Sequence, residues 1–153
     1  MPKNKLTIDF KGFEKMYEKL DRLGSNVNKA TEEALQKSKR LVHTQLGQAM
    51  SPHNNTFRTV RSLTKDNTVK FTGTKASIEV GFDISNGGLP SIFLMYGTPR
   101  HMGANQYGKH GKSVGATGQD MNLYNAIYGA STKRKVRKLQ KEIFDKALEE
   151  AMK

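Results

Sequence analysis

The spacing of hydrophobic residues changes several times along the chain, and each change predicts a different element. Residues 5–10, KLTIDF, alternate apolar and polar side chains, which predicts a short strand or an extended arm. Apolar residues then recur at helical spacing over 13–23, and Gly24 follows as a natural helix stop. A second, longer helix is predicted over 25–51, because its apolar residues keep helical spacing until a Ser-Pro pair ends the run.

The middle of the chain carries the strand signals. Residues 68–72, TVKFT, and 76–82, ASIEVGF, both alternate, and the TGTK between them indicates a hairpin turn. Residues 57–63, FRTVRSL, fit a short helix or a strand equally well. Residues 91–96, SIFLMY, are apolar without alternation, which predicts a strand that is covered on both faces.

The last third of the chain starts with a glycine-rich stretch. Residues 97–120 contain glycine at 97, 103, 108, 111, 115 and 118, which predicts a long flexible loop. Residues 121–128 fit a short helix, and residues 131–152 have the apolar stripe of an amphipathic helix. Strands grouped between helices predict a single α+β domain over 1–153. We expect a small antiparallel sheet packed against a long N-terminal helix and a C-terminal helix.

The small residues Ala30, Ala34 and Ser38 share the apolar face of the long N-terminal helix. Side chains of this size allow a neighbouring element to approach closely. We therefore expect this face to pack against the sheet or against a neighbouring subunit.

Composition narrows the classes of protein. The 153 residues include no cysteine, which excludes disulfides and thiolate metal sites and favours a cytoplasmic place of synthesis. No stretch approaches the roughly 20 apolar residues that span a bilayer, so no membrane association is expected. The formal net charge is +12 at pH 7. Such a surplus favours polyanionic surroundings such as nucleic acid or acidic protein surfaces, although it also serves solubility.

The sequence contains no recognisable catalytic constellation. It lacks a phosphate-binding P-loop, a nucleophile elbow and a His-Glu-x-x-His motif. The four histidines, His43, His53, His101 and His110, do not stand at short metal-site spacings. The HNN at 53–55 suggests a nuclease only if a second histidine or a carboxylate joins it around a metal. We therefore predict no enzyme activity, no metal and no cofactor.

Positive charge is concentrated at the start of the C-terminal helix. The stretch KRKVRKLQK contains no acid, although the helix macrodipole disfavours cations at that end. Only one aromatic residue, Tyr107, lies in the preceding loop, so base stacking is poorly supported. Contact with duplex phosphates, with DNA in a pore or with an acidic partner fits better, and a solvated helix face is the plain alternative. The candidate contacts are Lys109, Lys112, Lys133, Arg134, Lys135, Arg137 and Lys138, with Arg100 and Lys141 adding the same sign.

Three segments together resemble a phage protein family. They are an arm with helices (KGFEKMYEKLDRLGSNVNKATEEALQKSKRLV), a middle that ends in aromatic-Gly-Thr (IEVGF, then FLMYGTPRHM), and a final helix (KVRKLQKEIFDKALEEAMK). The chain resembles the siphophage neck, tail-completion or head–tail joining proteins of long-tailed bacteriophages. The most specific part is Met95-Tyr96-Gly97-Thr98 followed by Met102. The chain departs from the family where a Pro-Phe-x-x-Pro-Ala run often follows the Gly-Thr.

The resemblance implies a non-enzymatic virion protein. Such proteins form a ring, commonly a hexamer, at the head-proximal end of the tail or the base of the neck, with genome DNA in the lumen. The implied partners are other copies of the chain, the head-connector or stopper protein, and the tail tube or tail terminator protein. Assembly would take place in the cytoplasm of the bacterial host, and an isolated subunit can be a monomer.

The stretch after the predicted core strand is the expected interface. Gly97 is expected to allow backbone geometry or a close approach that a side chain would block. The corner would then direct the loop towards a neighbouring subunit or a partner ring, through Tyr96, Gly97, Thr98, Pro99, Arg100, His101 and Met102. Two alternatives stay open: a basic DNA-binding protein without catalysis, and, less favoured, a small metal-dependent nuclease.

Overall fold

The computed structural model describes residues 5–9, 26–53, 57–73, 75–99, 101–104 and 110–151. For the strands at 5–9, 101–104 and 110–114 it describes the backbone. The N-terminal part of this structure is β1 (Lys5–Asp9), the long helix α2 (Asn26–Met50), the 3-10 turn η1 (Ser51–His53) and the short helix α3 (Arg58–Arg61). The helix predicted over 13–23 lies outside the described residues.

The sheet follows in β2 (Lys70–Thr72) and β3 (Lys75–Gly81). It has three strands in the order β1-β3-β2, with both neighbours antiparallel to β3. Leu6 pairs with Val80, and Thr72 pairs with Lys75 across the predicted hairpin turn. The β2–β3 hairpin and the N-terminal strand are therefore confirmed, and residues 58–61 are helical, which resolves the ambiguity at 57–63.

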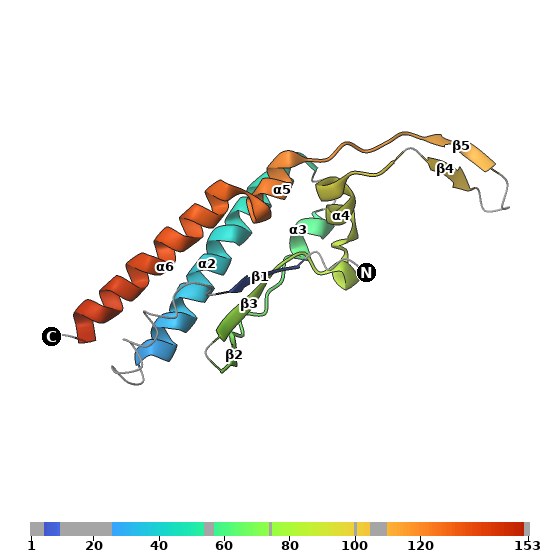
Figure 1. Ribbon diagram of the computed structural model, residues 1–153. Coiled ribbons are helices and arrows are strands. Elements are labelled where there is room, and N and C mark those ends of the chain that lie inside the picture. The colour runs from blue at the N-terminus through green and yellow to red at the C-terminus, as the bar shows by residue number, and fades with distance from the viewer. Residues whose placement is uncertain are drawn as a thin grey trace.

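The chain continues through the 3-10 turn η2 (Ile84–Asn86), helix α4 (Leu89–Tyr96), strands β4 (His101–Ala104) and β5 (His110–Val114), and helices α5 (Met121–Tyr128) and α6 (Ala130–Ala151). Helix α2 lies between the sheet on one side and α6 on the other (Figure 1). The predicted α+β class, with a small antiparallel sheet against a long N-terminal helix and a C-terminal helix, is confirmed. No helix in the described ranges has the length and apolar character needed to cross a membrane.

The core lies where β3, α2 and α5 meet. The alternating residues Ile78, Val80 and Phe82 are all buried, as the period-2 pattern predicts. They belong to one hydrophobic cluster with residues from the facing helices: Leu35, Val42, Leu46, Met50, Met95, Leu123, Ala126, Ile127 and Val136. Because α2 has a buried stripe along its length, it organises both the sheet and the C-terminal helices around itself.

The small residues of α2 have a different neighbour from the one expected. Ala30 and Ala34 form a second buried cluster with Val27 and with Phe144 of α6. The Ser38 hydroxyl is buried too and donates a hydrogen bond to the backbone oxygen of Ala34 (2.7 Å). The alanines therefore let α6 lie close to α2, while the sheet packs against other residues of the same helix.

Residues 91–96 form a helix and not the predicted strand. Helix α4 has Pro90 in its first turn and ends at Gly97, the usual places for these two residues at helix termini. Residues 84–86 form a 3-10 turn before it. We predicted that residues 57–96 hold the sheet, but this region also contains the helices α3 and α4. SIFLMY is apolar without alternation, a pattern that fits an apolar helix as well as a buried strand. A run this short does not distinguish the two.

Candidate assembly surface

Helix α4 buries one face and exposes the other. Ser91 and Met95, four residues apart, are fully buried. Leu89, Phe93 and Tyr96 lie at helical spacing on a different side and stay 47, 46 and 49% exposed. An amphipathic surface helix normally turns its large apolar residues inward, so three exposed ones on one short helix mark a surface that the described fold does not cover.

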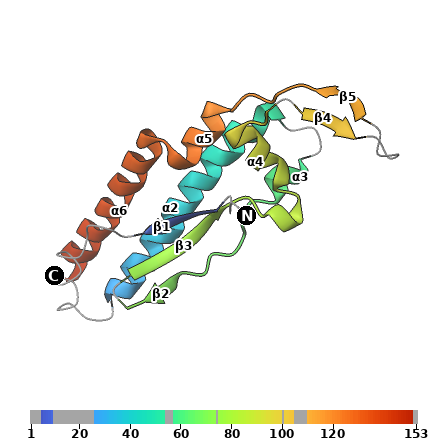
Figure 2. The ribbon, with the colours of Figure 1, turned by 45° about the vertical axis from the view of Figure 1, so that its right-hand side comes forward.

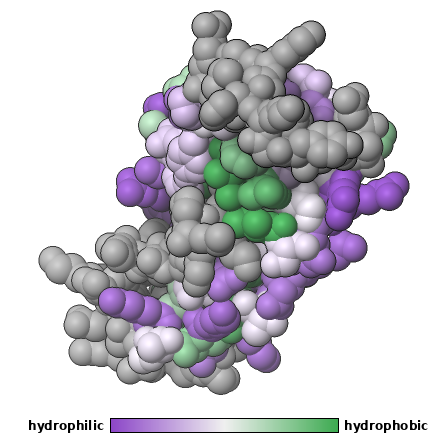
Figure 3. All heavy atoms as spheres, turned by 90° about the vertical axis from the view of Figure 1, so that its right-hand side faces the viewer, coloured by the Kyte–Doolittle hydropathy of each residue, from purple (hydrophilic) through white to green (hydrophobic). Residues whose placement is uncertain are grey.

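The side of the molecule on which α4 lies carries a hydrophobic area. Figure 3 looks onto this side and shows the area with hydrophilic residues on its flanks. Contiguous apolar patches with a polar rim are typical of sites for protein–protein contact. We call Leu89, Phe93 and Tyr96 the α4 face.

Tyr96 joins the α4 face to α5 through a cluster of three tyrosines. Its ring meets that of Tyr124 edge to face, with 6.2 Å between centroids, and Tyr124 lies 5.0 Å from Tyr128. The Tyr96 hydroxyl donates to the Tyr128 hydroxyl at 3.4 Å. Burial raises the pKa of Tyr128 above its usual range. Tyr96 is thus held in place on one side while about half of it stays accessible.

Gly97 makes the corner that follows α4. Its φ of 72° lies in the region that favours glycine, and a Cβ there would stand 2.8 Å from the backbone oxygen of Thr117. The expectation that Gly97 provides special geometry and a close approach is therefore confirmed. The segment that approaches Gly97 is the one around Thr117, where the chain comes back from β5. Thr98 and Thr117 exchange backbone hydrogen bonds of 2.9 and 3.1 Å.

Beyond this corner the chain forms a two-stranded ribbon. Strands β4 and β5 are antiparallel, with His101 opposite Val114 and Met102 opposite Ser113. The ribbon extends away from the helices and the sheet in both views (Figures 1 and 2). The predicted structureless loop over 97–120 is wrong in this respect. The ribbon is held together by backbone pairing between two segments that contain glycine. Such segments lack the apolar alternation that predicts a strand, so the pattern did not indicate them.

The structure places part of the predicted interface together. Tyr96, Gly97, Thr98 and Pro99 form the end of α4 and the corner, and His101 and Met102 lie in β4. Arg100 lies outside the described residues. Leu89 and Phe93 were missed as parts of one surface, because Phe93 was placed in a strand covered on both faces and Leu89 in a turn or loop before it. The available signal was helical spacing: four residues separate Leu89 from Phe93 and three separate Phe93 from Tyr96. Pro90 adds the proline that is typical of a first helical turn.

The predicted basic cluster stands apart from the ribbon. Lys133, Arg134, Lys135, Arg137 and Lys138 all lie on the first turns of α6 and are all exposed. Lys112 lies in β5 and Lys109 is outside the described residues. The backbone of the ribbon extends away from α6 in Figures 1 and 2, so β5 does not lie beside the cluster.

His53, the candidate nuclease residue, has a carboxylate partner. Its Nε2 lies 2.5 Å from Oδ2 of Asp120. Asp120 is the N-cap of α5, and its other oxygen, Oδ1, accepts hydrogen bonds from the backbone amides of Asn122 and Leu123. The hydrogen bond from His53, with those amides, lowers the pKa of Asp120. Within the described ranges no third acidic or histidine side chain joins a group that could hold a metal. The pair connects η1, which directly follows α2, to the N-cap of α5.

Comparisons with protein-family models, with curated proteins and with solved structures gave no match.

Proposed function

We propose that this protein is a virion structural protein of a long-tailed bacteriophage, a tail-completion or head–tail joining subunit that forms a ring around the DNA channel. The carrying observation is the exposed α4 face, with Leu89, Phe93 and Tyr96 next to a corner and a projecting ribbon. The most specific part of the sequence resemblance lies in this same segment. Burial of an apolar helix face against another protein lowers the free energy, and so does pairing of another strand with an extended two-stranded arm.

The two features suggest a division of labour in the ring. The α4 face supplies apolar area, and the ribbon supplies backbone hydrogen-bonding groups at its outer edges. We assign both to contacts with neighbouring copies of the chain or with an adjacent ring. The basic cluster on α6 then lies on a separate surface and is assigned to genome DNA in the lumen or to an acidic partner ring.

Complementation of a phage with a stop codon in this gene tests the proposal. Without the protein we expect DNA-filled heads beside complete, unattached tails in electron micrographs, and plasmid-supplied wild type should restore joined particles. Phe93→Asp should fold but fail to restore them, because it places a charge in the apolar contact. Phe71→Asp is the matched control, since Phe71 is equally exposed, at 45%, on β2.

One result would contradict the proposal, and a second would contradict its assignment of the α4 face. Intact, infectious particles from the stop-codon phage would exclude an essential role at the head–tail joint. Equal rescue by Phe93→Asp and wild type would remove the α4 face from the interface while leaving the ring itself open to other contacts.

The exposed cations of α6 favour a second candidate, a DNA-binding protein without catalysis. Five cations that each contact a phosphate of duplex DNA would make log affinity fall with log salt at a slope of about −4.5. Replacing Lys133, Arg134, Lys135, Arg137 and Lys138 by glutamine should then flatten the slope. Duplex binding by the isolated chain with this slope, together with normal particles from the stop-codon phage, would favour this candidate over the ring protein.

A further inference from the structure

A polar pocket of about 370 Å³ lies on a different part of the molecule, between α2, α3 and the segment that leads from α3 to β2. Its size is that of a small-molecule site. Neither the ring proposal nor the DNA-binding alternative uses it. Its polar wall consists of Arg40, His43, Arg61, Thr64, Lys65 and Asn67.

The charge of this pocket has one sign. Arg40 comes from α2, Arg61 from α3 and Lys65 from the following segment, and no carboxylate lines the pocket with them. Within the described ranges none of the three forms an ion pair. Three cations brought together from separate elements repel one another unless an anion lies among them. The three side chains are exposed, so water weakens their mutual repulsion, and an anion in the pocket would meet positive charge from three separate segments.

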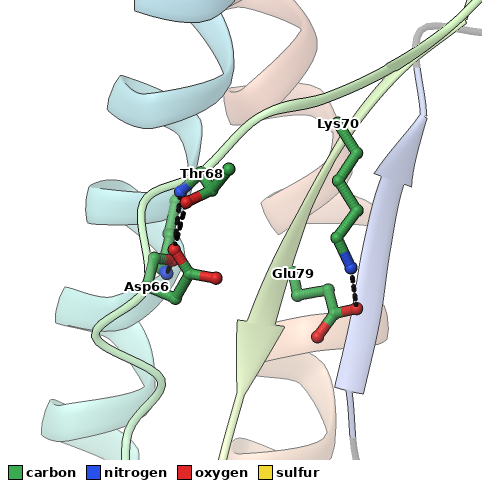
Figure 4. Close-up of polar contacts among 5 residues, drawn as sticks. Asp66, Thr68, Lys70 and Glu79 are labelled. Carbon is green, nitrogen blue, oxygen red and sulfur yellow. Dashed lines mark hydrogen bonds and ion pairs between the residues drawn. The ribbon is translucent and has the colours of Figure 1, made fainter.

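The adjoining pocket, of about 480 Å³, shows the opposite arrangement. It shares Arg61, Thr64 and Lys65 but also contains Asp66, Glu79 and Asp83. Its carboxylates are already engaged. Asp66 accepts from both the amide and the hydroxyl of Thr68, and Glu79 accepts from Lys70 at 3.1 Å (Figure 4). The hydrogen bonds from Thr68 lower the pKa of Asp66.

Lys39 adds a fourth positive charge on the side of α2 that carries His43. It is 1% exposed, and its ammonium donates to the backbone oxygen of Asp66, which ties the helix to the segment before β2. Burial lowers the pKa of His43, and the nearby Lys39 adds to this effect. The His43 ring is thus kept neutral, with one nitrogen available to donate a hydrogen bond.

Two polar atoms in the pocket wall have no partner among the described residues. They are Nε2 of His43 and Oγ1 of Thr64, and both are buried from solvent. A buried polar atom without a hydrogen bond costs free energy, so such an atom next to a cationic pocket points to a ligand that completes it. Because both atoms are closed off from solvent, a ligand in the pocket would reach them only after a change of side-chain rotamer.

We propose that this pocket binds a phosphate group. The guanidinium groups of Arg40 and Arg61 suit the paired oxygens of a phosphate, and Lys65 adds a point charge. Thr64 and His43 donate to the remaining oxygens. The pocket is larger than a phosphate ion, which leaves space for the group that carries it. That group is either absent, as in inorganic phosphate, or part of a nucleic-acid backbone.

Titration with inorganic phosphate at constant ionic strength tests the site, with amide chemical shifts as the readout. We expect saturable shifts in residues 40–43 and 60–67. Arg61→Gln should weaken binding at least about tenfold, because it removes a charge-assisted hydrogen bond. Arg58→Gln is the matched control: it removes the same charge from the same exposed helix but does not line the pocket, and it should change affinity less than about twofold.

A short oligonucleotide without terminal phosphate distinguishes the two sources. If Arg61→Gln weakens oligonucleotide and phosphate binding alike, and phosphate competes with the oligonucleotide, the phosphate belongs to nucleic acid. If only phosphate binding falls, the ligand is a small phosphate compound. Shifts that do not saturate, or equal losses in Arg61→Gln and Arg58→Gln, would overturn the proposal. Because the measurement uses the isolated chain, it does not depend on whether the ring proposal holds.

Discussion

The body of the molecule and its outer end use the same kinds of residue in opposite ways. In the body, β3, α2 and α5 bury their apolar residues against one another. At the outer end, α4 buries Met95 completely while Phe93, two residues earlier, stays 46% exposed, and the ribbon beyond it projects away from the core. The difference separates residues that hold the fold from residues that the fold leaves available to partners.

The largest expected effect comes from Met95. Met95→Ala should lower the free energy of unfolding by about 2–5 kcal/mol, because it removes a fully buried side chain from the main cluster. Urea denaturation followed by circular dichroism measures this loss. Phe93→Ser should stay within about 0.5 kcal/mol of wild type, as surface substitutions usually do. Similar losses in both variants would remove the distinction between the two sides of α4.

The corner between the two regions should be the next most sensitive position. Gly97→Ala should cost about 1–3 kcal/mol, because the residue has positive φ and its Cβ would approach the Thr117 oxygen. Thermal unfolding measures the loss, and faster amide exchange at Thr98 and Thr117 would locate it. Gly118→Ala is the control, since nothing lies within 4 Å of its added Cβ. Equal effects of the two variants would show that the corner is not constrained.

Asp120 links the body to the outer end and should give a smaller, pH-dependent effect. Asp120→Ala should cost about 1 kcal/mol, the usual value of a lost N-cap, and Asp120→Asn should retain most of the cap. The folded state lowers the pKa of Asp120, so its charge stabilises the fold above the unfolded-state value of about 3.9. This contribution should disappear as the pH falls through the folded-state pKa.

Denaturation of wild type and Asp120→Asn across the pH range from about 2 to 7 measures that contribution. The stability difference between them should shrink towards acid pH. A constant difference at every pH would mean that the hydrogen bond to His53 does not depend on the Asp120 charge.

The smallest effect is expected at the surface of the body. Lys70 and Glu79 form a 3.1 Å ion pair with both side chains largely exposed, at 63 and 43%. Lys70→Ala should change stability by less than about 1 kcal/mol, and added salt should reduce the change further. A larger loss, measured by urea denaturation at low and high salt, would show that the pair supports the β2–β3 hairpin.

The sequence predicts the elements whose pattern is long or strictly periodic. The helix predicted over 25–51 corresponds to α2, and the helix predicted over 131–152 to α6, since more than five turns of helical spacing leave little ambiguity. Ile78, Val80 and Phe82 identified the buried face of β3. The candidate surface could be predicted at Gly97, whose geometry is local, but Phe93 was assigned to a buried strand and Leu89 to a turn or loop.

The sequence by itself therefore determined the class of fold, the main helices, the central hairpin and the special role of Gly97, because each depends on local periodicity or local backbone geometry. Only the tertiary structure decided which side of α4 is covered, that Thr98 and Thr117 join the base of a ribbon, and that His53 meets Asp120. It also brought Arg40, Arg61 and Lys65 together around one pocket. These features depend on contacts between residues far apart in the chain, and no spacing within a single segment records such contacts.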